Sequence, residues 1–163
     1  MRFEEKGSME QIRTLKRLHK YLNREIFQNA LSEDIVIDIC NINKGERDED
    51  FAACFRREHI APDMKTRAIT LKEAVLFGNE FIYDDIARMK TQKAQAFVLG
   101  AVMLHEMIHQ YCYENGLDDT NHGGQWLETA ERFQLLSAYE DGELLSEELT
   151  EQGEYIVSSF RMR

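Results

Sequence analysis

Residues 96–126, AFVLGAVMLHEMIHQYCYENGLDDTNHGGQW, hold the most informative pattern in the chain. Apolar residues fall on more than one side of a helical wheel in the first half, which predicts a core helix over residues 91–113. Within it, His105, Glu106 and His109 form an HExxH sequence. Because residues four apart lie on one helical face, both imidazoles can bind one zinc ion, and Glu106 can contact a water bound to it.

This pattern indicates hydrolysis. Zinc lowers the pKa of a bound water to ~7, so Glu106 can take its proton as the water attacks a peptide carbonyl, and then deliver it to the leaving amine. One alternative is a zinc-stabilised protein- or DNA-interaction module without turnover. Glu106 argues against it, since a purely structural site prefers four protein ligands and does not need this carboxylate. Hydrolysis of a non-peptide amide is a further alternative, which a closed pocket would favour over an open cleft.

A third ligand is expected downstream, because a catalytic zinc typically has three protein ligands and one open position. No HExxHxxGxxH sequence follows His109, so the metzincin pattern is excluded. His122 lies in a polar turn before a second helix, predicted over residues 123–139, and can fold back over the HExxH face. Glu128, within that second helix, has a spacing close to that of thermolysin-like enzymes. His122 is the favoured ligand and Glu128 is its rival.

The flanking sequence predicts an α+β fold. Apolar residues at three- and four-residue spacing predict an amphipathic helix within residues 9–30. Alternating or β-branched segments predict three short strands. A mixed segment is expected to be partly helical, and a short helix is expected in the acidic tail. Together these elements form a small three-stranded sheet packed against the HExxH helix and flanking helices. The three strands are residues 35–40, 51–56 and 66–71, with charged or Pro-containing turns at 43–50 and 62–63, and the mixed segment is 72–90.

Length and composition predict one domain of 163 residues, with a core at about residues 10–140 and an acidic extension at 141–163. The longest apolar run, residues 96–104, is far below the ~20 residues that cross a bilayer, and no apolar signal segment is visible near the first residue. We therefore expect a cytoplasmic protein with no membrane partner. The 3 cysteines contain no CxxC pair and are expected to be small buried side chains in a reduced compartment.

Charge is distributed unevenly along the chain. The net charge is -10, and residues 101–163 alone account for it with 3 Lys and Arg against 13 Asp and Glu. Bulk electrostatics therefore argue against a general nucleic-acid binder. The first predicted helix carries a local basic patch, of the kind that usually forms a solvated helix face. Its members are Arg13, Lys16, Arg17, Lys20 and Arg24.

The run HEMIHQY (residues 105–111), followed by a polar turn and HGGQW (residues 122–126), resembles the SprT-like (Spartan) family of zinc metallopeptidases. Residues 21–27 are similar to the opening helix of that family, and residues 54–56 and 69–71 to its central strands. The resemblance covers about residues 10–140 and is distinctive at residues 105–126.

The resemblance implies a zincin-like fold and one catalytic Zn²⁺. It also implies His105, His109 and His122 as metal ligands, Glu106 as the catalytic base, and a protein or peptide substrate. DNA is a further partner that the family implies and the net charge does not support. Many members carry a cysteine-rich zinc ribbon after the protease core, whereas this chain has no cysteine after Cys112.

Three further features bear on catalysis. A residue that stabilises the oxyanion is expected near the zinc, and the sequence leaves Tyr111, Tyr139 and Tyr155 open for that role. Trp126 could line the substrate cleft, although a large aromatic residue near a core helix is more often packing. The strand at residues 66–71 is expected at the sheet edge, where an extended substrate would add by β-augmentation.

Separate alanine substitutions distinguish the two candidates for the third ligand. We expect His122→Ala to lose zinc, because a site of three ligands falls to two, whereas Glu128→Ala keeps about one zinc per chain. Atomic emission spectroscopy of the purified variants gives their zinc content. Equal zinc retention by the two variants would contradict the assignment of His122.

Overall fold

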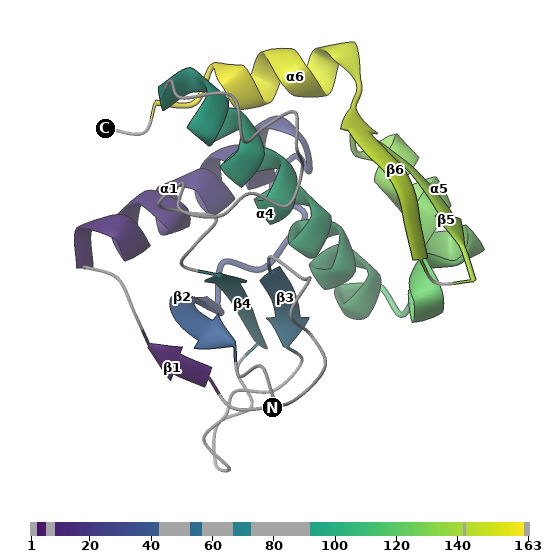
Figure 1. The fold of residues 1–163 in the computed structure, drawn as a ribbon, viewed down its shortest axis with the longest axis horizontal. Coiled ribbons are helices and arrows are strands. Elements are labelled where there is room, and N and C mark those ends of the chain that lie inside the picture. The colour runs from purple at the N-terminus through teal and green to yellow at the C-terminus, as the bar shows by residue number, and fades with distance from the viewer. Residues whose placement is uncertain are drawn as a thin grey trace.

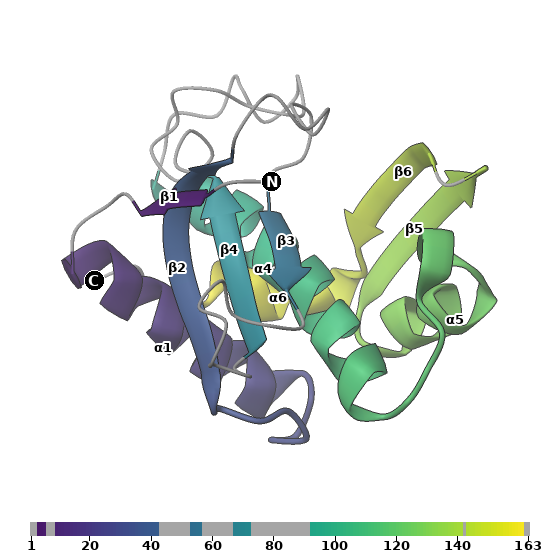
Figure 2. The same ribbon diagram turned by 90° about the horizontal axis from the view of Figure 1, so that it is seen from below.

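The computed structural model describes residues 3–5, 9–42, 53–56, 67–72, 92–141 and 143–161. Within these residues the fold is α+β, as predicted, and α1 and α4 cover one face of a four-stranded sheet (Figures 1 and 2). The elements, in chain order, are β1 (Phe3–Glu5), α1 (Met9–Glu25), β2 (Ile35–Ile42), β3 (Ala53–Arg56), β4 (Arg67–Lys72), α4 (Gln92–Glu114), the 3₁₀ turn η2 (Thr120–His122), α5 (Gly124–Arg132), β5 (Leu135–Glu140), β6 (Glu143–Leu149) and α6 (Glu151–Ser158).

The sheet has the strand order β1-β2-β4-β3, in which β2 and β4 are parallel and the outer pairs are antiparallel. The three predicted strands are confirmed as β2, β3 and β4. The prediction of a three-stranded sheet is wrong, because Phe3–Glu5 adds β1 as a fourth strand, which is too short to show an alternating pattern. The expected edge position of residues 66–71 is also wrong. β4 lies between β2 and β3, so β3 is the outer strand on that side.

Helix α1 places its apolar stripe on the core and its charges outward. Leu15, Leu18 and Leu22 are almost fully buried, at the spacing that predicted this helix. After the helix the chain turns through Gln28 and Asn29, which have φ of 49° and 62°. The Asn23 side chain bonds both the N–H and the carbonyl of Leu31 at 3.0 Å, and these bonds fix the turn that leads to β2.

Helix α4 runs through the centre of the molecule (Figure 1). Met103, Leu104, Met107 and Ile108 have no exposed surface, which confirms the prediction of a core helix. It packs on β3 and β4 on one side and on α6 on the other. No helix in the described residues combines the length and the apolar character that a bilayer span requires.

A buried polar contact joins α4 to α1. His19 Nε2 lies 2.9 Å from Gln110 Oε1, and the Gln110 amide also donates to the Ser32 carbonyl and to Glu114. Burial lowers the pKa of His19 and outweighs the opposing influence of Gln110 and two nearby carboxylates. His19 therefore stays neutral at pH 7 and serves the packing of the two helices.

The second helix is shorter than the sequence predicts. The prediction extends it to residue 139, but α5 ends at Arg132 and the chain continues as the hairpin β5–β6. Gln134 has a left-handed φ of 77°, which ends the helix, and the buried pair Leu135 and Leu149 closes the hairpin against the core. The Asp-Gly pair after β5 is the hairpin signal in the sequence that the helical interpretation missed. The alternation of burial along β5 follows from the structure and not from the sequence.

The acidic segment after Asp141 packs onto the rest of the protein. Val157 of α6 is fully buried and lies against α4. Cys112 is a free, buried thiol, and burial raises its pKa to about 11, so it is unreactive at neutral pH. The predicted turns at residues 43–50 and 62–63 lie outside the described residues. So does the partly helical segment predicted at 72–90, except for Lys72, which ends β4.

Gly100 allows α4 and α6 to approach each other. A Cβ at this position would collide with Cγ1 of Val157. We expect Gly100→Ala to lower the free energy of unfolding by about 1–3 kcal/mol, because the fully buried Val157 would have to shift out of its packed position. Urea denaturation followed by circular dichroism measures the change.

Gly124→Ala is the matched control, because a Cβ at Gly124 would meet no atom within 4 Å. Its stability should equal or slightly exceed that of the wild type, since alanine is the better helix former. A Gly100→Ala variant as stable as Gly124→Ala would contradict the close packing of α4 against α6.

Candidate metal centre

Three histidine side chains converge at the C-terminal half of α4. His105 and His109 come from α4, and His122 comes from η2. The Nε2 atom of His122 lies 3.1 Å from that of His109 and 3.2 Å from that of His105. Nitrogen ligands of a tetrahedral zinc, at bond lengths of ~2.0–2.1 Å, lie about 3.3 Å apart, so this spacing fits a single ion. The three histidines could hold a metal ion.

Carboxylates contact the Nδ1 atoms of two of the rings, on the side away from the other histidines. Nδ1 of His105 lies 2.9 Å from Glu147 Oε2, and Nδ1 of His109 lies 2.8 Å from Asp119 Oδ2. A neutral imidazole that donates from Nδ1 keeps the lone pair on Nε2, so these bonds point both lone pairs toward His122. Ser137 also donates to Glu147 Oε2 at 3.0 Å, which fixes the carboxylate in turn. Imidazole nitrogens suit several transition metal ions, and the predicted zinc is one that this donor set fits.

A tight turn after α4 carries His122 to the site. The N–H of Leu117 donates to the Cys112 carbonyl at 2.8 Å, and Gly116 supplies the positive φ of 67° that this helix end requires. Asn121 and His122 then adopt left-handed φ angles of 55° and 54°. That conformation is uncommon for histidine, and such strain concentrates at functional sites.

Two aromatic side chains pack against the histidine cluster. Trp126 is fully buried, with its ring centroid 4.9 Å from His105, 5.3 Å from His109 and 4.6 Å from His122. Tyr139, from β5, stacks on His122 with centroids 4.2 Å apart and planes 4° from parallel. Trp126 therefore packs directly against all three imidazoles, and Tyr139 restricts the rotation of the third.

Of the three tyrosines considered for oxyanion stabilisation, one lies at the cluster. Tyr111 packs against Phe133 in the core, and its hydroxyl accepts a hydrogen bond from Arg132. Tyr155 is 74% exposed on α6. Tyr139 is the tyrosine that the structure brings against a histidine of the cluster.

The environment sets different pKa values for two of the imidazoles. Burial, together with the neighbouring His105 and His109, lowers the pKa of His122 to about 4. Burial acts in the same direction on His105, but its bond to Glu147 and the charges of Glu106 and Glu147 outweigh burial and raise its pKa. His122 is thus neutral at pH 7, which is the form that binds a metal.

Glu106, the predicted base, and Glu128, the rival third ligand, lie in different environments. Glu106 is buried on α4, directly after His105 in the sequence. Glu128 is exposed on α5 and is not a member of the histidine group. Sequence reasoning missed the carboxylates of Asp119 and Glu147. Asp119 lies in the polar turn three residues before His122, so its position in the sequence could have identified it. Glu147 could not be identified in this way, because the hairpin that brings it to His105 was not predicted.

Comparison of the chain with models of known protein families, with curated proteins and with solved structures finds no match. The geometry of the three imidazoles and of the side chains around them is what indicates a function for this chain.

Replacing either supporting carboxylate should weaken metal binding while leaving the three ligands in place. We expect Glu147→Gln and Asp119→Asn each to lower zinc affinity about 10–100-fold, because the imidazole loses the charged acceptor that orients it. Competition with a chromophoric chelator measures the affinity. Glu148→Gln is the matched control, since Glu148 is exposed on the same strand. Equal affinities for Glu147→Gln and Glu148→Gln would contradict the supporting role.

Proposed function

We propose that this protein is a zinc-dependent metalloendopeptidase of the SprT-like, zincin-like type that hydrolyses peptide bonds in protein substrates. The observation that carries the proposal is the convergence of three imidazole Nε2 atoms at 3.1 Å and 3.2 Å, next to Glu106 in the HExxH sequence of the same helix. A group of three histidines supports a catalytic rather than a structural site, because structural zinc sites use four protein ligands.

His105, His109 and His122 would hold the ion. When bound there, zinc supplies a polarised water whose pKa is ~7 and a Lewis acid for the scissile carbonyl. Glu106 accepts the proton of the attacking water and returns it to the leaving amine. Glu147 and Asp119 keep the two α4 imidazoles in the tautomer that exposes Nε2, and Trp126 excludes water from one side of the cluster.

Tyr139 is our choice for the residue that stabilises the oxyanion. Its ring is fixed by stacking on His122, so its hydroxyl is held in one region beside the site. A positioned hydroxyl donor near a developing negative charge lowers the barrier because it needs no reorganisation during the reaction.

Glu106→Gln separates metal binding from turnover. We expect this variant to keep about one zinc per chain and to lose activity on casein by at least about 100-fold, because general base catalysis is removed while the ligands remain. His109→Ala should lose both zinc and activity. Zinc content and casein cleavage are measured on the same preparations, with and without single-stranded DNA, which tests whether DNA stimulates the enzyme.

Two results would contradict the proposal. Full activity of Glu106→Gln would remove the assigned base. A zinc-loaded wild-type protein without Glu106-dependent cleavage would instead favour the alternative function, an interaction module in which zinc holds the elements together without turnover.

A further inference from the structure

The β5–β6 hairpin lies on the opposite side of α4 from α1 and has two different faces (Figures 1 and 2). Ser137, Tyr139 and Glu147 are part-buried on the inner face, toward the histidine cluster, and the register places Ser137 opposite Glu147. The outer face is exposed to solvent. It carries Leu136, Ala138, Glu140, Ser146 and Glu148.

The base of the hairpin is fixed without any contribution from the histidines. Leu135 and Leu149 are directly opposed, and both are buried in the core. The N–H of Thr150 donates to the Gln134 carbonyl at 2.9 Å, and the Thr150 hydroxyl donates to the Gln134 side chain. Gly153 packs so closely that a Cβ there would lie 2.9 Å from the same carbonyl. These contacts hold the two strands together where they join the rest of the protein.

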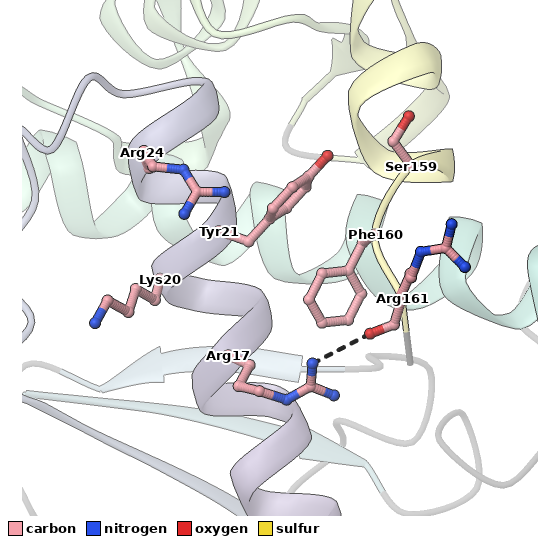
Figure 3. A pocket seen from close by; sticks show the side chains of 7 residues that line it. All are labelled: Arg17, Lys20, Tyr21, Arg24, Ser159, Phe160 and Arg161. Atoms are coloured by element: carbon pink, nitrogen blue, oxygen red, sulfur yellow. Dashed lines mark hydrogen bonds between the residues drawn. The ribbon is translucent and has the colours of Figure 1, made fainter. Parts of the chain in front are cut away.

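The chain after the hairpin is also anchored away from the cluster. Helix α6 packs on α4, and the Tyr21 hydroxyl of α1 donates to the Ile156 carbonyl. Phe160 packs on the Tyr21 ring with centroids 5.3 Å apart. Figure 3 shows this contact, together with the hydrogen bond from Arg17 to the Arg161 carbonyl. Helix α6 therefore provides a fixed segment with which the hairpin can be compared.

Glu147 and Tyr139 connect the hairpin to the histidine cluster. Oε2 of Glu147 lies 2.9 Å from Nδ1 of His105, and Tyr139 stacks on His122 with centroids 4.2 Å apart. Ser137 donates to the same carboxylate oxygen at 3.0 Å, which holds Glu147 where it reaches the imidazole. The Glu147 side chain is only 8% exposed, so it has little contact with water and depends on these donors.

The far end of the hairpin is weak on its own. Glu140 lies directly opposite Glu143, and like charges at opposed positions destabilise an antiparallel pair. A two-stranded hairpin is at best marginally stable in water without a surface to pack on. Beyond its base, the docking of this hairpin therefore depends on the contacts of its inner face.

Metal binding strengthens those contacts in two ways. His105 donates more strongly from Nδ1 when its Nε2 binds a cation, because the ring loses electron density and the bond to Glu147 becomes charge-assisted. A cation also satisfies the crowded Nε2 atoms. His105 and His109 donate from Nδ1 to carboxylates, so the single Nε2 of His122 can donate to only one of its two neighbours, at 3.1 Å and 3.2 Å.

We propose that the β5–β6 hairpin is a metal-dependent clamp, in which docking of its inner face and binding of a metal ion stabilise each other. Loss of the metal releases the hairpin between its base and its turn, so the supply of metal regulates the closure of the site. Because linkage is reciprocal, a change that weakens docking weakens metal binding by the same factor. The clamp rests on the metal site of the proposed function but does not depend on peptide hydrolysis.

Hydrogen exchange of the full chain, measured by mass spectrometry with zinc and after its removal by a chelator, tests the proposal. We expect the amides of residues 136–148 to exchange at least about tenfold faster in the metal-free protein, because the inner-face contacts weaken. The amides of α6 should change less than about threefold, since α6 is held by α1 and α4.

Ser137→Ala tests the reciprocal effect, because it loosens Glu147 without touching a histidine. We expect zinc affinity to fall about 3–10-fold, measured by competition with a chromophoric chelator. Ser146→Ala is the matched control, since Ser146 is exposed on the outer face of the same hairpin. Its affinity should stay within about twofold of the wild type, and thermal melts establish that both variants fold.

Several outcomes overturn the clamp. Equal exchange of the hairpin in the two states overturns it, and so does a uniform slowing over the hairpin and α6, because zinc would then stabilise the whole fold without a clamp. Equal zinc affinities for the two serine variants also overturn it. A protein that binds no zinc overturns both the clamp and the metal centre, whereas selective protection without casein cleavage supports the clamp and contradicts only the hydrolysis.

Discussion

The hydrogen bonds from imidazole Nδ1 atoms to part-buried carboxylates are the constraint on which the site depends. Three part-buried imidazoles directed at one another are unfavourable unless their polar atoms have partners. Glu147 and Asp119 satisfy the outer nitrogen of His105 and His109, at 2.9 Å and 2.8 Å, and leave the inner nitrogens of the cluster for a cation. The same bonds connect α4 to the turn after it and to the β5–β6 hairpin, so the site and the C-terminal part of the fold stabilise each other.

The acidic C-terminal segment, residues 141–161, therefore has a structural role. It supplies Glu147 to the histidine cluster, Leu149 to the core and Val157 to the face of α4 that carries Gly100. Its outward carboxylates maintain the strongly negative charge of this part of the chain. The end of the segment packs against α1, where the Arg17 guanidinium lies over the Phe160 ring and donates to the Arg161 carbonyl.

Local patterns could be predicted from the sequence, and contacts between distant segments could not. The spacing of His105 and His109 places both on one helical face, and His122 follows within a short turn, so all three candidates were identifiable. Glu147 is 42 residues from His105 and reaches it through a hairpin that begins where the left-handed Gln134 ends α5. The helical pattern continues through that point in the sequence, because Ala130, Phe133 and Leu136 are apolar at three-residue spacing. The first strand escaped prediction because three residues are too few to establish a period.

X-ray absorption spectroscopy of the zinc-loaded protein tests the central claim most directly. A catalytic site formed by His105, His109 and His122 predicts three imidazole nitrogens at ~2.0–2.1 Å, one further light atom from an open position, and no sulfur. Multiple scattering from the rings would identify the nitrogens as imidazole. A sulfur neighbour at ~2.3 Å, or a shell of oxygen atoms with fewer than three imidazoles, would contradict the account.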